Sequence, residues 1–211
     1  MRRVQDSGLA LPTFFLPEEN TVSITLAHPL RRRLLGALAL APAAFAWRQV
    51  HAQAVAPARA LDVPYVPTPM PVVNAMLHLA GVKKSDTLID LGCGDGRIVI
   101  RAAERYGCRG VGVDLDPLRI SEAQQNARDR KVESLTRFVV GDVFEFDFSK
   151  ATVVTMYLLP SINLKLRPRL LAELAAGTRI VSHDFDMGDW KPDRQRDVDN
   201  SVIYLWTVPR K

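Results

Sequence analysis

The sequence predicts an α/β fold in which an open, mostly parallel sheet carries helices on both faces. Short apolar segments alternate with longer amphipathic ones from residue 68 to residue 208, an order typical of parallel strands joined by right-handed crossovers. Segment 151–158 is apolar on both faces, as expected of a central strand in such a sheet. With 211 residues, of which 47% are hydrophobic, the chain is long enough for one domain with a sizeable core.

The elements follow one another without an internal repeat. Thr68 and Pro69 form a favourable N-cap and first-turn pair for a helix that ends near Gly81. Further helices are predicted at 97–106, from 117 to about 130, and at 164–174, where Pro168 lies near the start. Strands are predicted at 87–91, 110–114, 136–140, 151–158, 178–182 and 202–208.

Residues 1–60 differ from the rest of the chain. They hold seven arginines and three acidic residues, which accounts for +4 of the formal net charge of +5. Three arginines at 31–33 precede the apolar run 34–46 and then Ala52-Gln53-Ala54, the layout of an export signal; the paired arginines also resemble a twin-arginine signal. At ~1.5 Å per residue the run reaches only about 20 Å, less than the ~30 Å of a bilayer core.

We therefore expect a poorly ordered leader over 1–60, with a linker at its end, and a single domain over 61–211. The leader indicates export or membrane tethering, and a cytoplasmic location if it is not used. The alternative is a basic, alanine-rich leader with no targeting role. The remaining chain has a net charge of +1, so it lacks the broad basic surface expected of a nucleic-acid-binding domain, although a net charge leaves room for a local basic patch.

The two cysteines, Cys93 and Cys108, are not expected to form a disulfide. They flank the predicted helix 97–106, which separates them by roughly 15 Å, beyond the reach of a disulfide. No Cys/His cluster suggests a bound metal either. We expect Cys108 to be a small buried apolar residue.

A glycine turn stands between the first predicted strand and its helix. The apolar run ends at Asp90, glycines follow at 92, 94 and 96, and the helix begins at Arg97. Such a turn lets a ligand lie against backbone N–H groups at the positive end of a helix. A dinucleotide motif needs Gly or Ala where Arg97 stands, and the Gly-Lys-Ser/Thr of a P-loop is absent.

Acidic residues follow the next two strands. Asp114 ends the second strand, and Asp142 follows the third. In an open α/β sheet, ligands bind at the carboxyl ends of the strands. A carboxylate at 114 can accept from both hydroxyls of a ribose, and Asp142 is placed to meet an adenine amino group. Either residue alone is more typical of a turn or a cap, but the set of acids and glycines favours a ligand site.

This constellation resembles the class I S-adenosylmethionine-dependent methyltransferases. The resemblance implies their Rossmann-like fold and S-adenosyl-L-methionine as cofactor. It implies that Asp90 and the glycines at 92, 94 and 96 contact the amino-acid part of the cofactor, Asp114 the ribose and Asp142 the adenine. Tyr65 is placed to close over the cofactor or to pack nearby. Because the chain ends soon after segment 202–208, we expect the last antiparallel strand of this fold to be missing, which would leave an open sheet edge.

Four segments narrow the resemblance. They lie at 65–69 (YVPTP), 95–100 (DGRIVI), 157–160 (YLLP) and 182–193. Together they resemble bacterial relatives of the mitochondrial lysine methyltransferases that act on the ATP synthase c-subunit and the ADP/ATP carrier, over roughly 62–206. The resemblance implies N-methylation of a protein lysine, with a small membrane protein as partner. The alternatives are a small-molecule methyltransferase and a non-catalytic S-adenosylmethionine-binding protein.

The candidate catalytic residues lie in the loop after the fourth strand. A lysine ammonium has no lone pair and must lose a proton, although its ordinary pKa is about 10.4. We expect Tyr157 and the loop Leu158–Pro160 to line the target channel, with the backbone carbonyls of Leu158 and Leu159 as acceptors for the amine hydrogens. The alternative for Tyr157 is a packed aromatic side chain whose hydroxyl is hydrogen-bonded locally. His183, Asp184 and Asp186 could bind a metal or act as bases, but capping acids beside a solvated histidine are the commoner arrangement. Trp190 lines the substrate entrance or anchors its loop.

Overall fold

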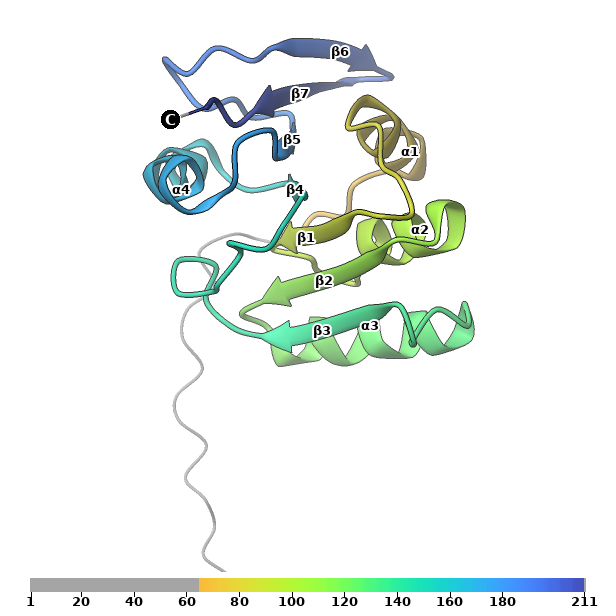
Figure 1. The fold of residues 1–211 in the computed structure, drawn as a ribbon. Coiled ribbons are helices and arrows are strands. Elements are labelled where there is room, and N and C mark those ends of the chain that lie inside the picture. The colour runs from red at the N-terminus through yellow and green to blue at the C-terminus, as the bar shows by residue number, and fades with distance from the viewer. Residues whose placement is uncertain (1–64, 211) are drawn as a thin grey trace, which may run out of the picture. The chain divides into compact units, whose positions relative to one another are not determined.

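The computed structural model describes residues 65–210 and shows one mixed sheet covered by helices (Figure 1). The helices are α1 (Met70–Leu79), α2 (Arg97–Tyr106), α3 (Pro117–Asp129) and α4 (Pro160–Glu173). The strands are β1 (Thr87–Leu91), β2 (Arg109–Asp114), β3 (Thr136–Val140), β4 (Val153–Met156), β5 (Arg179–His183), β6 (Arg194–Val198) and β7 (Ser201–Thr207). The predicted leader lies outside the described residues.

The strands are arranged in the order β3-β2-β1-β4-β5-β7-β6. The strands β1 to β5 are parallel, and β7 is antiparallel to both β5 and β6. The open α/β fold with a mostly parallel sheet is therefore confirmed. The carboxyl ends of the parallel strands meet at one edge, where the candidate ligand-binding residues were expected.

The expectation that the last antiparallel strand is missing is wrong. The predicted strand 202–208 is β7, which lies beside β5, and a further strand, β6, covers its other side. The sequence RQRDV of β6 shows no apolar alternation because the strand lies at the sheet edge, where its first four residues are exposed. Charged side chains on an edge strand oppose pairing with another chain. The charged residues that obscured the strand pattern of β6 therefore also disfavour aggregation through this edge.

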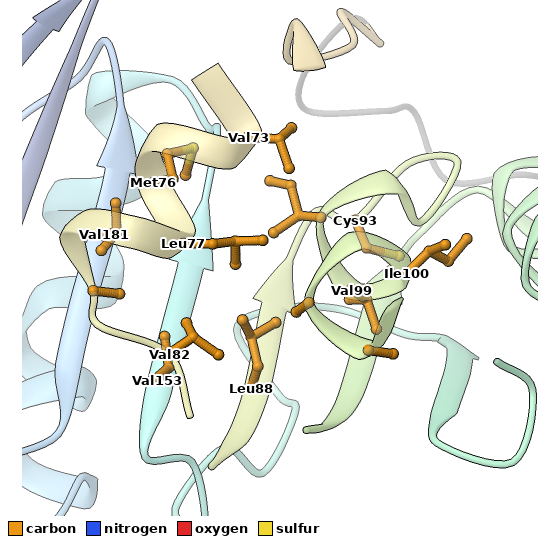
Figure 2. Close-up of a cluster of buried hydrophobic side chains, with 14 of the residues drawn as sticks. Val73, Met76, Leu77, Val82, Leu88, Cys93, Val99, Ile100, Val153 and Val181 are labelled. Atoms are coloured by element: carbon orange, nitrogen blue, oxygen red, sulfur yellow. The ribbon is translucent and has the colours of Figure 1, made fainter. Parts of the chain in front are cut away.

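The core lies on both faces of the sheet. One cluster joins the sheet to α1, α2 and α3, and the other joins it to α4 (Figure 1). Leu88 of β1 belongs to the first cluster and its neighbour Ile89 to the second, as the alternation of a strand buried on both faces requires. Figure 2 shows the first cluster, where Met76 and Leu77 of α1 meet side chains of α2 and the sheet.

Two helix starts differ from the prediction. The residue before the first turn of α1 is Pro69, not Thr68, and Thr68 forms no side-chain cap. The first turn of α4 begins at Pro160 rather than at Leu164, because proline is favourable at the first helical position although the apolar pattern starts later. Within residues 65–210, no helix is both long and apolar enough to cross a membrane. Both cysteines are buried and unpaired with each other.

Candidate functional site at the glycine turn

A pocket opens at the carboxyl edge of the sheet, above the glycine turn. Seven of the sequence-predicted site residues line it: Tyr65, Asp90, Gly92, Gly94, Asp114, Tyr157 and Leu158. They come from five segments, namely the residues before α1, the turn after β1, and the ends of β1, β2 and β4. The structure therefore brings together residues up to 93 positions apart in the sequence.

Two glycines let side chains close against the turn. Both Gly92 and Gly94 have positive φ angles, of 76° and 52°, which favour glycine. A Cβ at Gly92 would lie 2.6 Å from Cδ2 of Leu158, and one at Gly94 would lie 2.5 Å from Cε2 of Tyr65. The turn therefore admits Leu158 on one side and Tyr65 on the other only because it has no side chains there.

Gly96 does not line the pocket, contrary to the expectation from the sequence. It precedes α2 as its N-cap residue, and a Cβ there would lie 2.6 Å from the ring of Phe138 and 2.8 Å from Ala123. Its role is to let the start of α2 pack closely against β3 and α3.

The backbone amides of the turn are already used within the protein. The N–H groups of Gly92 and Cys93 both donate to the carbonyl of Val113, at 2.9 and 3.0 Å. The N–H of Gly94 donates to Oδ2 of Asp114 at 2.8 Å. The expected cradle of free N–H groups is therefore not formed by these residues. Their engagement leaves few donors for a phosphate, and the carboxylates nearby favour a cationic ligand instead.

Asp90 is a buried acid at the base of the pocket. Its side chain is 2% exposed and accepts a hydrogen bond of 2.7 Å from Thr155, its neighbour across β1 and β4. Burial raises the pKa of Asp90 to about 7, aided by the charges of Asp114 and Asp95 and opposed by the Thr155 hydrogen bond. A cation bound in the pocket would favour the ionised form of this carboxyl group.

Asp114 holds the turn and still has acceptor capacity. Its Oδ2 accepts from the N–H of Gly94, and its Oδ1 accepts from the N–H of Asp116 at 3.0 Å. Because each carboxylate oxygen has two lone pairs, both can accept a further hydrogen bond from a ligand hydroxyl. The geometry is compatible with the ribose contact expected from the sequence, which stays a prediction.

Residues 65–69, here called the strap, close one side of the pocket. The guanidinium of Arg119 lies 4.5 Å from the centroid of the Tyr65 ring, so Tyr65 is held between α3 and the glycine turn. Arg97 donates to the carbonyl of Thr68 at 2.9 Å. The same guanidinium pairs with Asp95 at 2.6 and 2.9 Å. Although burial opposes it, this pairing lowers the pKa of Asp95.

Tyr157 lines the pocket and packs against residues at the end of β5. The ring of Tyr157 lies 3.8 Å from that of His183 and 6.1 Å from that of Phe185, centroid to centroid. Its hydroxyl donates to Oδ2 of Asp184 at 3.4 Å. Burial and the charge of Asp184 raise the pKa of Tyr157.

His183 is not the solvated residue that the sequence suggested. It is 1% exposed; its Nδ1 lies 3.1 Å from Oγ1 of Thr68, and its Nε2 lies 2.9 Å from Oγ of Ser201. Burial lowers the pKa of His183, although Asp184 opposes this effect. A buried imidazole with both nitrogens engaged joins the strap to β7. Sequence patterns gave no sign of this partnership.

The prediction of capping acids after β5 is confirmed. Asp184 accepts the N–H of Val202 at 3.0 Å, and Asp186 accepts the N–H of Gly188 at 3.0 Å. Trp190 anchors its loop, because its carbonyl accepts the indole N–H of Trp206 at 2.8 Å. Among residues 65–210, no group of three or more His, Cys, Asp or Glu side chains is arranged to hold a metal.

Besides Gly96, two further predicted site residues, Asp142 and Pro160, lie outside the pocket lining. Asp142 forms a turn, in which its Oδ1 accepts the N–H of Phe144 at 2.9 Å; Val143 and Phe144 line the pocket in its place. Pro160 is exposed in the first turn of α4. The position after β3 had indicated Asp142 as a ligand-binding residue, but the turn places Val143 and Phe144 at the pocket instead.

The pocket fits S-adenosylmethionine, the ligand that the sequence resemblance implies. Two carboxylates, Asp90 and Asp114, face a turn whose amides are taken, which suits a ligand with a sulfonium and an ammonium group. Apolar walls of Leu115, Val143 and Phe144 suit a flat aromatic base. Asp90 and Asp114 would hold the cofactor's polar groups and Tyr65 would cover it.

Comparison with known proteins also indicates a methyltransferase. A family model described as the ANTKMT methyltransferase domain matches residues 90–194. A protein-lysine N-methyltransferase of Saccharolobus islandicus is 45% identical over 151 residues, 69% of this chain and 94% of that protein. A lysine N-methyltransferase of the ATP synthase c-subunit, from Xenopus laevis, is 34% identical over 140 residues, 66% of this chain and 61% of that protein. The chain thus spans about three fifths of the Xenopus protein.

A solved structure is also similar. It is described as an RNA methyltransferase from Salinibacter ruber in complex with S-adenosyl-L-homocysteine, and it is 56% identical with a TM-score of 0.68. The similarity covers 69% of this chain and 95% of that chain. The similar proteins agree on methyl transfer, but their descriptions name different acceptors, a protein lysine and RNA.

Proposed function

The chain belongs to the ANTKMT methyltransferase family, whose cofactor is S-adenosylmethionine, and we propose that it methylates the side-chain amine of a lysine in a protein. The observation that carries this proposal is the carboxylate of Asp184 beside the hydroxyl of Tyr157, a residue that lines the pocket. In the part of the chain that the structure describes, Asp184 pairs with no lysine or arginine, and its only ion-pair contact is His183. A carboxylate without a cationic partner suits a substrate that arrives as an ammonium.

The charges around the pocket support a protein acceptor over RNA. Of the arginines that line the pocket, Arg97 pairs with Asp95 and Arg119 with Glu122 at 2.7 Å. An RNA site needs cations that are free to neutralise phosphates, whereas these arginines are already paired with acids.

The chemistry requires alignment more than acid–base help. S-adenosylmethionine, when bound, supplies a methyl group on a sulfonium, and the leaving thioether is neutral. The residues of this chain therefore orient the two reactants and exclude water. Asp90 and Asp114 fix the cofactor side, and the strap covers it through Tyr65. The hydroxyl of Tyr157 and the carbonyls of Leu158 and Leu159 are the acceptors proposed for the amine hydrogens.

Label transfer tests the proposal. The protein is incubated with cofactor labelled in the methyl group and with extract from a strain that lacks the gene. We expect label that survives ribonuclease, is lost on proteolysis and maps to methyl-lysine by mass spectrometry. Label that is lost on ribonuclease treatment would establish an RNA acceptor instead. Label confined to small metabolites would favour a small-molecule enzyme, and cofactor binding without transfer would favour a non-catalytic protein.

The location and the acceptor protein are proposed together. We propose that the leader tethers the enzyme to the membrane with its domain in the cytosol, where S-adenosylmethionine is made, and that a small membrane protein is the acceptor. The description of the Xenopus relative, which names the ATP synthase c-subunit, supports such an acceptor. Cell fractionation with an antibody to the domain tests this: we expect the protein in the membrane fraction, accessible only from the cytosolic side. A soluble or exported protein would overturn it.

A further inference from the structure

Asp184 follows β5 in a backbone conformation with a positive φ angle. Its φ angle is +59°, in the left-handed region that is unfavourable for residues other than Gly, Asn and Asp. Its N–H donates to the carbonyl of Val202 at 2.7 Å, and its Oδ1 accepts the N–H of Val202 at 3.0 Å. Two hydrogen bonds to one residue of β7 therefore fix the carboxylate and leave its other oxygen for a different partner.

That other oxygen faces the hydroxyl of Tyr157. Oδ2 of Asp184 lies 3.4 Å from the Tyr157 hydroxyl and 3.4 Å from Nε2 of His183. His183 has a shorter partner in Ser201, at 2.9 Å. Because an ionised carboxylate only accepts hydrogen bonds, the hydroxyl of Tyr157 must be the donor in its contact with Asp184. A separation of 3.4 Å is long for such a bond, as catalytic hydrogen bonds often are before substrate binds.

The direction of this hydrogen bond decides what Tyr157 offers to the pocket. A phenol has one hydrogen and two lone pairs. When the Tyr157 hydroxyl donates its hydrogen bond to Asp184, only the lone pairs of the phenolic oxygen remain for a ligand. The raised pKa of Tyr157 keeps the hydroxyl protonated near neutral pH, and the flanking rings of His183 and Phe185 limit its movement. Tyr157 therefore presents an acceptor, not a donor, at the pocket.

We propose that Asp184 is a positioning residue for methyl transfer, which accepts the Tyr157 hydrogen so that the phenolic oxygen can accept an N–H of the substrate amine. The inference rests on the proposed function, because it requires an amine acceptor. Binding one N–H at Tyr157 restricts rotation of the amine and directs its lone pair toward the methyl carbon. Neither Tyr157 nor Asp184 changes its protonation state.

The step balances without a further reactant. The lysine ammonium first loses one proton to water. The nitrogen lone pair then forms a bond to the methyl carbon while the carbon–sulfur bond breaks, and the electron pair of that bond stays on sulfur. The product is a methylated ammonium and a neutral thioether.

The variant Asp184→Asn tests the direction of the hydrogen bond. Asparagine tolerates a positive φ, and its amide oxygen can still accept from Val202. The NH₂ group then replaces Oδ2 and donates to Tyr157, so the phenolic hydrogen must turn toward the pocket. The substrate is the acceptor protein identified by the label-transfer experiment. We expect kcat for its methylation to fall about ten- to hundredfold. The Kd for S-adenosylhomocysteine, measured by calorimetry, should stay within twofold of the wild-type value.

Two further variants complete the test. Asp199→Asn is the matched control, because Asp199 also has a positive φ, of 51°, is exposed and does not line the pocket; we expect wild-type kcat. Tyr157→Phe keeps the ring packing and removes the hydroxyl, and we expect it to lower kcat. In the Tyr157→Phe background, Asp184→Asn should cause little further loss, because the two residues act through one hydrogen bond.

Three results would overturn the inference. They are wild-type kcat in Asp184→Asn, an undiminished loss when that change is added to Tyr157→Phe, and loss of cofactor binding in Asp184→Asn, which would indicate a structural role. Each differs from failure of the proposed function, in which the wild-type protein itself transfers no label to a protein lysine.

Discussion

The hydroxyl of Thr68 lies 3.1 Å from Nδ1 of His183, although the two residues are 115 positions apart in the sequence. Both side chains are buried, at 4% and 1% exposure. The contact joins the strap before α1 to the end of β5, and the other ring nitrogen of His183 extends the connection to Ser201 of β7. The strap, which forms one wall of the cofactor pocket, is thus hydrogen-bonded to β5 and β7.

Removing this hydroxyl should destabilise the fold measurably. Thr68→Val keeps the shape of the side chain but leaves Nδ1 of His183 without a partner. A buried polar group that loses its hydrogen bond costs about 1–3 kcal/mol, so urea unfolding should show a loss of that size. Thr207→Val, at an exposed position of β7, serves as control and should change stability by about 0.5 kcal/mol or less. Equal effects of the two changes would show that the Thr68 contact contributes nothing.

A methyl group at Gly94 should reduce cofactor binding by displacing Tyr65. Gly94→Ala places a Cβ 2.5 Å from the Tyr65 ring, whereas Gly81, which also has a positive φ, of 60°, has no atom within 4 Å of an added Cβ. Both changes introduce backbone strain of about 1–2 kcal/mol. Only Gly94→Ala should weaken S-adenosylhomocysteine binding by about tenfold or more, equal to ~1.4 kcal/mol, when measured by calorimetry. Similar affinities in the two variants would argue against a role for Tyr65 at the cofactor.

The carboxylate of Asp114 should contribute directly to cofactor affinity. Asp114→Ala removes the acceptor expected to bind the ribose hydroxyls and is predicted to weaken cofactor binding by about 1–3 kcal/mol. Asp129→Ala, at the exposed end of α3, is the control and should bind normally. Calorimetry measures both. Because Asp114 also accepts the N–H of Gly94, thermal unfolding should accompany the titration. Unchanged affinity in a folded Asp114→Ala variant would remove the ribose assignment.

The buried acid Asp90 should make stability depend on pH. Its pKa is about 7 in the folded protein and about 3.9 in an unfolded chain, so between these values the folded protein retains a proton that the unfolded chain has released. The contribution of Asp90 is fully present below the lower value and is lost as pH rises through the upper one.

The variant Asp90→Asn removes this dependence. The free energy of unfolding of Asp90→Asn, relative to wild type, should therefore increase by about 2–3 kcal/mol between about pH 5 and about pH 8. Urea unfolding of both proteins at the two pH values measures the difference. Parallel pH profiles would show that Asp90 does not titrate in this range.

Part of the site could be predicted because local patterns carry it. Asp90, the glycines and Asp114 occupy strand ends and a turn, and strand ends are visible as the point where an apolar run stops. Strand β6 was missed because it carries no such apolar run. It lies at the sheet edge, where burial does not require apolar and polar residues to alternate. Asp142 has the expected place in the chain, but a local turn occupies its side chain and brings Phe144 to the pocket.

The sequence by itself determined the order of the elements other than β6 and the position of the glycine turn, because burial periodicity and backbone conformation are properties of neighbouring residues. The cofactor type came from the resemblance of its motifs to those of a known family. Only the tertiary structure decided which groups meet across the sheet edge. Thr68 has the sequence position of a helix cap, but its hydroxyl contacts His183. The amides of the turn donate to Val113 and Asp114. The carboxylate of Asp184 accepts from the hydroxyl of Tyr157. These pairings depend on strand order and register, which bring distant side chains within hydrogen-bonding distance and leave no periodic signal in the chain.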